Sequence, residues 1–434
     1  MKFNIYTLGC KVNTYETNVM SDLLKNKGYI EVGLDEKADI SIINTCTVTN
    51  TADNKSFKTI RHAIKQNDDA IIVVVGCMSQ NKKEEVLKVD GVDIVLGNIG
   101  KSKVVEYIDE YIKTKKKKLD IYDMMDTTFE PMILNNFNRT RAFVKIEDGC
   151  NNYCAFCIIP YVRGNVRSKD KDSVIEETKD LIKQGHKEIV LTGIHTGHYG
   201  SDLKNYNFSN LLNDLCKISG LERLRISSIE ITELTDEFLE VLKNNKILVD
   251  HMHIPLQSGS DATLKRMNRK YDKKYFMDKI EKIRKIRPEI SISTDVIVGF
   301  PNETIEEFNE TIETIKKIKF SKLHVFPYSR RKGTKADEME NQIDEKTKKE
   351  RVKILIELSK ELETEYMEKF INRELIFIPE VIKDGYLIGH TGNYLQVKAK
   401  SNLNLIGKDV KVKLIKVEYP SIIGDIIDYK ENIV

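Results

Sequence analysis

Residues 150–157 read Cys-Asn-Asn-Tyr-Cys-Ala-Phe-Cys, and this stretch decides how the chain is interpreted. Cys150, Cys154 and Cys157 have the spacing C-x3-C-x2-C and directly follow a predicted strand, residues 142–146. Thiolates this close can bind one metal centre. A structural zinc site or a [4Fe–4S] cluster normally takes four protein ligands, and the next histidine is His186. Three thiolates therefore favour an iron–sulfur cluster with one open iron, with zinc, redox and structural roles as alternatives.

From this segment onward, β-branched strands alternate with helices. The predicted strands are residues 142–146, 188–191, 223–227, 251–256, 292–298 and 322–326. The helices predicted between them include residues 171–184, 233–244, 271–286 and 304–318. Alternation of this kind indicates a parallel sheet, so six such units predict a partial (β/α)6 barrel. One long charged helix, expected over residues 337–372, follows the last strand.

The first part of the chain predicts a separate α/β unit with an open parallel sheet. Its expected strands are residues 3–8, 39–45, 70–76 and 93–96. Cys10, Cys46 and Cys77 each come just after one of these strands. Because ligands bind at the carboxyl edge of such a sheet, three loops could bring three thiolates together there. The alternative is three unrelated thiols near strand ends.

The last part of the chain changes character. Short β-type runs at residues 375–379, 394–399 and 410–417 are separated by glycines, which predicts a small antiparallel β-barrel or sandwich. We therefore expect three domains, at residues 1–118, 136–370 and 371–434. A lysine-rich run at residues 113–118 closes the first domain and is typical of a solvated helix end or linker, less often of a basic binding patch.

The composition is that of a folded chain with ample core. Of 434 residues, 40% are hydrophobic and 32% charged, which excludes a disordered or collagen-like chain. The net charge of +3 excludes a protein that binds nucleic acid by bulk charge, although a local basic face stays possible. Seven cysteines are too few for a disulfide scaffold, and Cys216 lies in an apolar helical context that favours the core. Without an apolar run of transmembrane length or a signal-peptide layout, we expect a cytoplasmic protein with no membrane partner.

The cysteine segment on the first strand of a (β/α) barrel resembles the signature of radical S-adenosylmethionine enzymes. Together with residues 8–13 (LGCKVN), 44–46 (NTC) and 76–78 (GCM), it resembles the methylthiotransferases over nearly the whole chain. Further matches are residues 148–150 (DGC), 159–164 (IPYVRG), 253–260 (HIPLQSGS) and 295–301 (DVIVGFP). Asn302 departs from the usual glycine, and asparagine tolerates positive φ next best. The C-terminal part resembles the family's RNA-binding TRAM domain.

Three segments resemble one branch of the family most closely. They are residues 8–13, 191–197 (LTGIHTG) and 324–329 (HVFPYS). That branch adds a methylthio group to C2 of N6-threonylcarbamoyladenosine at position 37 of tRNA. The alternatives are methylthiolation of isopentenyladenosine 37 or of a ribosomal-protein aspartate, a non-enzymatic iron–sulfur RNA-binding redox sensor, and a zinc-binding RNA module.

The resemblance implies two [4Fe–4S] clusters. Cys150, Cys154 and Cys157, the radical triad, would hold a cluster whose open iron binds S-adenosylmethionine and cleaves it to a 5′-deoxyadenosyl radical. Cys10, Cys46 and Cys77, the auxiliary triad, would hold a cluster that supplies sulfur, and a second S-adenosylmethionine supplies the methyl group. Adenine C2 carries no acidic hydrogen, so no catalytic residue beyond the cluster ligands is expected. The implied partners are tRNA, through adenosine 37 of its anticodon loop, and an electron donor such as a flavodoxin or ferredoxin.

Contacts to S-adenosylmethionine are expected mainly at the barrel strand ends, which form the functional face of such folds. The candidates are Phe156, Thr192, Gly193, Ser228, Glu230, Gln257, Ser258 and Gly299. Four histidines, His195, His198, His251 and His253, could suggest a metal set, but polar contacts are the favoured interpretation. RNA contacts are expected at Arg163, Arg167, Lys398, Lys400, Lys411 and Lys413, with a solvated strand face as the alternative for the lysines.

Overall fold

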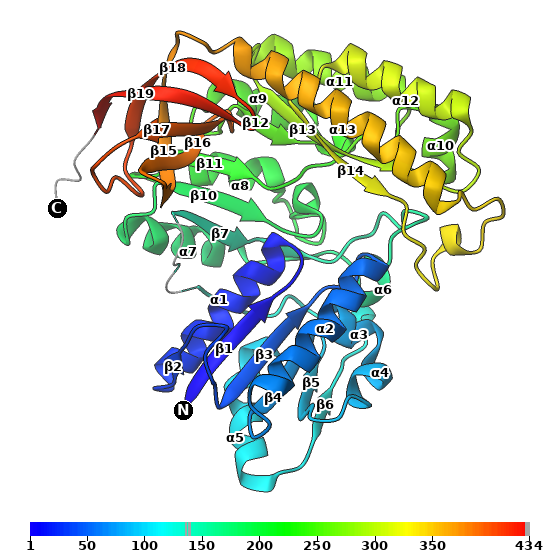
Figure 1. Ribbon diagram of the computed structural model, residues 1–434, viewed down its shortest axis with the longest axis vertical. Helices are drawn as coiled ribbons and strands as arrows, with labels where there is room; N and C mark the ends of the chain where they lie inside the picture. Colours follow the sequence, from blue (N-terminus) through cyan, green and yellow to red (C-terminus); the bar gives the residue numbers. More distant parts are fainter. Residues whose placement is uncertain (135–136, 138–139, 430–434) are drawn as a thin grey trace.

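The computed structural model describes residues 1–134, 137 and 140–429. An N-terminal α/β unit packs against a partial barrel, and a small closed barrel follows at the C-terminus (Figure 1). The fold class expected from the sequence is confirmed by this arrangement. Within the described residues, no helix has the length and apolar character needed to cross a membrane.

The N-terminal unit contains a six-stranded parallel sheet in the order β2-β1-β3-β4-β5-β6. Its strands are β1 Lys2–Thr7, β2 Ile30–Glu31, β3 Ile40–Thr45, β4 Ile71–Gly76, β5 Ile94–Leu96 and β6 Lys118–Asp120. Its helices are α1 Lys11–Asn26, α2 Asn50–Gln66, α3 Cys77–Asn81, α4 Lys83–Leu87, η1 Lys101–Lys103 and α5 Val104–Thr114. Every residue of β3 and β4 is buried, as expected for central parallel strands covered on both faces.

Two edge strands of this sheet were not predicted, because they are too short and too polar to stand out. β2 has two exposed residues, and β6 begins at Lys118, inside the lysine run. The run is therefore only partly a helix end or linker, and its last residue pairs with β5. Lysines on an edge strand discourage pairing with other chains.

The partial barrel contains six parallel strands in chain order, in two sheets, β7-β10-β11 and β12-β13-β14, linked by a parallel bridge between Leu224 and Leu248. The strands are β7 Arg141–Lys145, β10 Glu188–Thr192, β11 Arg223–Ile226, β12 His251–His253, β13 Ser291–Val298 and β14 Lys322–Pro327. The helices are α6 Ile159–Arg163, α7 Lys171–Lys183, α8 Phe208–Cys216, α9 Asp236–Asn244, α10 Asp261–Arg266, α11 Lys273–Ile286 and α12 Ile305–Ile318. Short elements are η2 Met124–Asp126, β8 Glu147–Asp148, β9 Arg167–Ser168, η3 Thr196–His198, η4 Ile231–Glu233 and η5 Lys335–Asp337.

The long helix α13, Glu345–Glu368, is shorter than the predicted residues 337–372. It begins where the side chain of Asp344 accepts a hydrogen bond from the Thr347 backbone N–H at 2.9 Å, and this N-cap fixes the helix start. The charged residues before it lie in η5 and turns, which the pattern of charges did not distinguish from helix. Asn302 adopts φ of 62°, as its place in a turn suggested.

The C-terminal unit is a closed barrel in the order β15-β16-β17-β19-β18. Its strands are β15 Glu374–Lys383, β16 Tyr386–Thr391, β17 Gln396–Lys400, β18 Val410–Glu418 and β19 Ser421–Tyr429. β17 and β19 pair in parallel, so the barrel is not wholly antiparallel as predicted. The sequence interpretation took the glycines in β16 and β19 as breaks between strands, but both lie within strands. A Cβ on Gly389 in β16 would lie 1.9 Å from the Ile378 carbonyl oxygen of the neighbouring strand. This glycine allows close strand approach instead.

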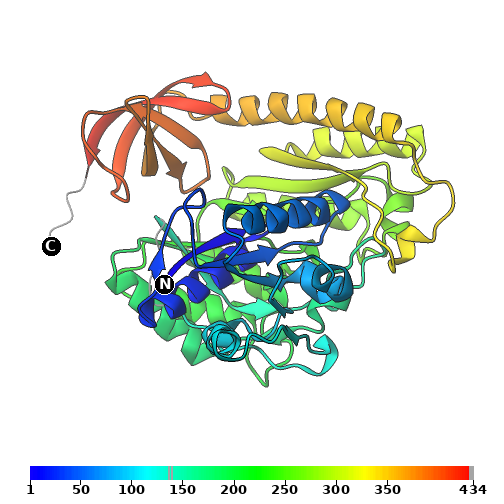
Figure 2. The same cartoon turned by 60° about the horizontal axis from the view of Figure 1, so that its bottom comes forward.

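The N-terminal unit contacts the partial barrel at two places, on α7 near the first barrel strand and on the segment that follows the last strand, β14 (Figures 1 and 2). On one side, the Tyr15 hydroxyl of α1 donates to a carboxylate oxygen of Glu177 on α7 at 2.8 Å. On the other side, Arg331, which follows β14, reaches the loop after β3. Its guanidinium donates to Thr47 Oγ1 at 2.7 Å and pairs with Asp53 at 2.9 Å, and its side chain is 4% exposed. The auxiliary triad therefore faces the barrel.

We predict that Arg331→Met lowers the free energy of unfolding by about 3 kcal/mol or more, because it leaves the buried Asp53 carboxylate poorly compensated. Urea denaturation measures the change. The matched control is Arg330→Met, whose half-exposed ion pair with Asp337 should contribute less than about 1 kcal/mol. Equal losses for the two variants would contradict the prediction.

Candidate active site

The radical triad lies on a loop that leaves β8 at the carboxyl end of the barrel. Gly149 starts this loop with φ of 90°, and a Cβ there would lie 1.9 Å from the Asn165 carbonyl oxygen, so only glycine fits. The Cys150 backbone N–H donates to the Gly164 carbonyl at 3.0 Å, and the Cys157 N–H to the Cys154 carbonyl at 3.0 Å. These hydrogen bonds hold the loop in a curved conformation, and its three thiols lie together at the carboxyl end of the barrel.

Two side chains, Arg269 and His195, contact the radical triad, and the sequence did not single out Arg269. The Arg269 guanidinium donates to Cys154 Sγ at 3.0 Å and forms an ion pair with Glu230. His195 Nδ1 lies 3.6 Å from Cys150 Sγ. Arg269 is more than a hundred residues from Cys154 in the chain, so no local spacing could have indicated this contact. Donors to a ligating sulfur tune a metal centre, and the loop fits one.

The auxiliary triad lies at the carboxyl edge of the three adjacent strands β1, β3 and β4. Gly9 has φ of 94°, and a Cβ there would lie 2.9 Å from Cys46 Sγ. Cys46 therefore packs directly against the loop that carries Cys10. Burial, reinforced by the neighbouring Cys77 and Cys10 thiols, raises the pKa of Cys46 to about 12. The three strand-end cysteines thus gather at one edge, and this donor set suits an iron–sulfur centre.

Arg163 connects the two cysteine loops. It was predicted to contact RNA, but its side chain is buried and 0% exposed. It donates to Cys77 Sγ at 3.2 Å, to Asn13 Oδ1 at 2.9 Å and to both carboxylate oxygens of Asp148 at 3.0 Å. Arg167 is also buried, and donates to the carbonyls of Arg163 and Asn165. Both RNA predictions fail because the two side chains are buried, Arg163 between the units and Arg167 within the barrel unit.

The surroundings of Arg163 carry excess positive charge. Four cations, Lys101, Lys145, Arg163 and Arg167, approach only two ionised carboxylates, Glu16 and Asp148. Burial raises the pKa of the adjacent Glu147 carboxyl well above its usual value and so favours its neutral form. The excess lies beside Cys77, where thiolates ligating a cluster would supply negative charge. The charge balance therefore fits an anionic centre held by the auxiliary triad.

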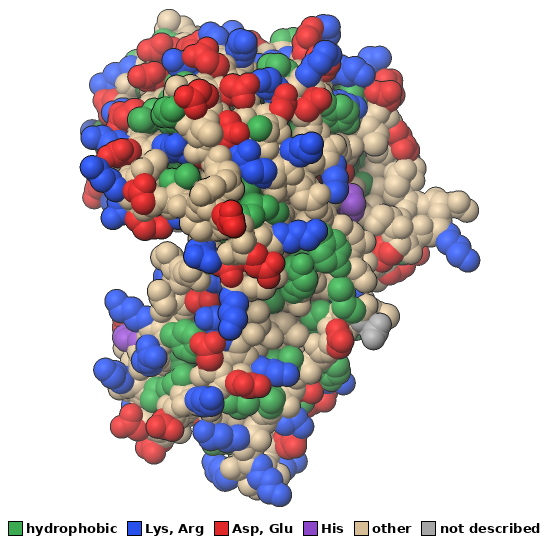
Figure 3. All heavy atoms as spheres, turned by 90° about the vertical axis from the view of Figure 1, so that its right-hand side faces the viewer, with side chains coloured by type: hydrophobic (Ala, Val, Ile, Leu, Met, Phe, Trp, Pro, Cys, Tyr) green, Lys and Arg blue, Asp and Glu red, His purple; other side chains and the backbone are tan. Residues whose placement is uncertain are grey.

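A cavity of about 290 Å³ touches both cysteine loops. Val48 and Thr49, just after Cys46, form one wall, and Phe156 and Cys157 form another. Figure 3 shows hydrophobic side chains gathered at the waist between the barrel and the N-terminal unit on this side of the molecule. Gln257 lines the same cavity with φ of 64°, and among the described residues its buried Oε1 has no hydrogen-bond partner. Phe156 and Gln257 are therefore placed to contact a ligand.

The other predicted S-adenosylmethionine contacts divide into two groups. Thr192, Gly193, Ser228 and Glu230 lie at the ends of β10 and β11 on the cysteine side, although Glu230 is held by Arg269. Ser258 and Gly299 do not line the cavity beside Cys157, and their contacts with S-adenosylmethionine stay predictions. Ser258 is buried against α12, with its hydroxyl 3.2 Å from Thr311 Oγ1. A Cβ on Gly299 would lie 2.4 Å from Cγ of Lys348 on α13, so α13 fills the space on the Cβ side of this residue.

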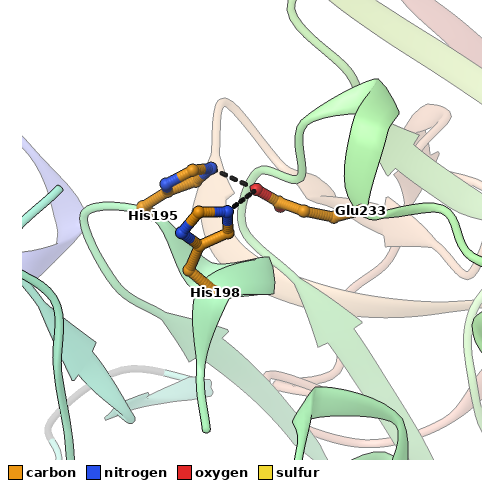
Figure 4. Close-up of side chains that lie close together, drawn as sticks. All are labelled: His195, His198 and Glu233. Carbon is orange, nitrogen blue, oxygen red and sulfur yellow. Dashed lines mark ion pairs between the residues drawn. The ribbon is translucent and has the colours of Figure 1, made fainter. Parts of the chain in front are cut away.

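His195, His198 and Glu233 form a compact group beside Cys150 (Figure 4). The two imidazoles stack at 3.9 Å, and both approach the Glu233 carboxylate. Burial, with the His195 charge nearby, lowers the pKa of His198 to about 4. His251 and His253 lie elsewhere, on β12, so the four histidines do not form one metal set.

A second cavity, of about 500 Å³, is bounded by all three units. Lys11 contributes from the N-terminal unit, Arg225, His251 and His253 from the barrel, and Tyr394 from the C-terminal unit. Burial, with the charges of Arg141 and Arg225, lowers the pKa of Lys11 to about 8. This cavity is polar and cationic, in contrast to the apolar cavity beside Cys157.

Comparison with known proteins identifies first the enzyme class and then the protein family to which this chain belongs. A model described as the radical SAM superfamily matches residues 144–315, and one described as uncharacterized protein family UPF0004 matches residues 2–97. A radical S-adenosylmethionine methyltransferase of Kitasatospora setae shares the fold, with a TM-score of 0.58 and 12% identity over 77% of this chain and 76% of that one. Fold and cysteine loop define a radical S-adenosylmethionine enzyme, a class that uses S-adenosylmethionine and a [4Fe–4S] cluster.

Two curated relatives narrow the assignment. A threonylcarbamoyladenosine tRNA methylthiotransferase of Bacillus subtilis is 47% identical, over 98% of this chain and 96% of that protein. A tRNA-2-methylthio-N6-dimethylallyladenosine synthase of Clostridium botulinum is 36% identical, over the same shares. The chain belongs to the methylthiotransferase family of radical S-adenosylmethionine enzymes. The family expected from the sequence is thereby confirmed.

We predict that the radical triad binds metal more tightly as the pH rises from 6 to 8. Burial raises the pKa of Cys157 to about 12, so each ligating thiol must release a proton, and affinity should rise by up to about tenfold per pH unit for each thiol. Co²⁺ titration, followed by thiolate-to-metal absorption in a variant with the auxiliary triad changed to alanine, measures this slope. Cys216→Ala is the control and should leave it unchanged. An affinity that does not vary with pH would contradict the prediction.

Proposed function

We propose that this enzyme transfers a methylthio group to C2 of N6-threonylcarbamoyladenosine 37 in tRNA, using two [4Fe–4S] clusters and S-adenosylmethionine. The observation that carries the proposal is the cavity of about 290 Å³ whose walls come from both cysteine loops. A substrate carbon placed there would lie between a radical source and a sulfur source. The threonylcarbamoyl group is proposed because the 47% identical relative is named for it.

When bound, the cofactors supply reductive cleavage of S-adenosylmethionine and a transferable sulfur. The protein's own residues bind, orient and exclude water. Phe156 and Gln257 would position S-adenosylmethionine beside the radical triad, with Thr192, Gly193 and Ser228 at neighbouring strand ends. Arg269 holds Cys154 and Glu230 in place, and Arg163 fixes the auxiliary loop through Cys77. The apolar walls of the cavity, such as Ile297 and Phe326, would protect a radical from side reactions.

We propose further that the three parts of the chain have separate roles. Residues 1–118 would hold the auxiliary cluster, residues 136–370 would perform the radical chemistry, and residues 371–434 would bind the anticodon region of tRNA. A low-potential donor such as a flavodoxin or ferredoxin would deliver the electron. A cytoplasmic location fits a tRNA-modifying enzyme.

An anaerobic iron and sulfide count tests the two-cluster proposal. Reconstituted wild type should hold about eight irons, and the variant with Cys10, Cys46 and Cys77 changed to alanine about four, as two [4Fe–4S] clusters require. Methylthio transfer to tRNA should be lost in the variant while 5′-deoxyadenosine formation survives. About four irons in both proteins would refute the proposal that Cys10, Cys46 and Cys77 hold a second cluster. Mass analysis of nucleosides then separates threonylcarbamoyladenosine from isopentenyladenosine as substrate, and a ribosomal-protein aspartate is tested on the protein itself.

The predicted RNA-binding lysines of the C-terminal barrel differ in their surroundings. Lys398 and Lys400 point outward from β17 on the same face as Gln396, which lines the large cavity. Lys411 and Lys413 lie on β18, separated from β17 by β19. Lys411 pairs with Glu374 at 2.7 Å, and Lys413 stands opposite Glu374 and Asp425. The β17 lysines are therefore the stronger candidates for phosphate contacts.

We predict that the double variant Lys398→Ala, Lys400→Ala weakens tRNA binding. The slope of log Kd against log salt should become shallower by about 1 for each lost phosphate contact. Filter binding across a salt series measures it. The matched double variant Lys411→Ala, Lys413→Ala should change the slope less, because these lysines already face carboxylates. The reverse order would assign the contact surface to β18.

A further inference from the structure

The cationic cavity of about 500 Å³ has a wall of positively charged side chains, and some of their hydrogen-bond donors have no acceptor among the described residues. Arg225 is 2% exposed and pairs through Nε with Glu188 at 2.6 Å, and its Nη2 donates to the Gly392 carbonyl at 3.3 Å. Its buried Nη1 has no partner among the described residues. For the Lys11 ammonium, too, no ion pair or hydrogen bond is found within the described part of the chain. A buried donor left without an acceptor, such as Arg225 Nη1, is costly, and the partly buried Lys11 ammonium lines the same cavity, so this wall fits an anionic ligand.

The rest of the cavity limits where such an anion can sit. Tyr394 stacks on His251 and on His390, each at 4.5 Å, and lies 4.8 Å from the Arg225 guanidinium. His251 Nδ1 is another buried atom that lacks a partner among the residues described. A carboxylate that also lines this cavity, Glu363, is already paired with Lys322 at 2.9 Å. The unpaired donors thus concentrate on the side formed by Lys11 and Arg225.

This cationic cavity adjoins the apolar one beside Cys157. His253 lines the cationic cavity, Asp295 lines the apolar one, and their side chains pair at 3.2 Å. Lys11 directly follows Cys10 in the chain. A ligand that reaches toward the cysteine loops could therefore leave a charged substituent against Lys11 and Arg225. The volume of about 500 Å³ is within the usual range for small-molecule sites.

We infer that Lys11 and Arg225 bind the carboxylate of the N6 substituent and so make this enzyme select an anionic adenine substituent over an apolar one. The inference rests on the proposed function, because it assumes that the substrate base enters this cavity. An isopentenyl group offers no acceptor and would leave both cations unpaired. A backbone phosphate of the tRNA has the same anionic chemistry. The depth of Arg225 in the molecule favours the carboxylate, since phosphates can be met by lysines at the surface.

Binding of anticodon stem-loops to the full-length, cluster-loaded protein tests the inference. Three RNAs of one sequence carry threonylcarbamoyladenosine, its methyl ester, or unmodified adenosine at position 37. Wild type should prefer the free acid to both others. Lys11→Met should weaken binding of the free acid by about tenfold, the typical effect of losing one charge-assisted hydrogen bond, and leave the other two RNAs unchanged. Lys11→Arg should restore the preference, and Lys25→Met, on the exposed face of α1, should have no effect.

Each other outcome overturns a specific statement. Equal weakening of all three RNAs by Lys11→Met would assign Lys11 to a phosphate and refute the inference. A preference that survives both Lys11→Met and Arg225→Lys would also refute it, while the proposed substrate would stand. If wild type shows no preference for threonylcarbamoyladenosine over adenosine, the proposed substrate itself falls.

Discussion

The buried guanidinium of Arg163 is the contact on which the arrangement of both cysteine loops depends. It leaves α6, a few residues after the radical triad, and ends at Cys77 of the auxiliary triad. Glu16 and Asp148 form ion pairs with it, one from each of the two units that it joins. A buried ionic network of this kind is no more stable than well-packed apolar residues would be, because desolvation offsets the attraction. Because the guanidinium contacts Cys77 and carboxylates from both units, it constrains the distance between the two cysteine loops.

Much of the fold could be predicted because its central elements have strong local signals. β4, Ile71–Gly76, is buried at every residue and therefore shows a continuous apolar run. The elements that were missed lack such a signal. β6 is three residues long, and α13 starts at its Asp344 cap rather than where the charged residues begin. In the C-terminal barrel, Gly389 was interpreted as a break, although close strand approach is what requires a glycine there.

The candidate site was predictable where the chemistry is local and not where it depends on tertiary contacts. The spacing of Cys150, Cys154 and Cys157 is a property of eight residues. Ser258 and Gly299 show the limit, because a strand-end position identifies the functional edge of a barrel but not the side to which a residue turns. Arg163 shows a second limit. An arginine close to a cofactor loop has the same sequence context whether it meets a nucleic acid or a buried carboxylate.

The two cavities would meet different requirements of the proposed reaction. A radical requires walls with few reactive polar groups, and the cavity beside Cys157 supplies them through Ile297 and Phe326. Discrimination between substituents on one base requires buried polar groups that a wrong ligand leaves unpaired, since a hydrophobic pocket discriminates weakly. If the substrate binds as proposed, Lys11 and Arg225 would contact its N6 substituent in the adjoining cavity, apart from the apolar walls beside Cys157.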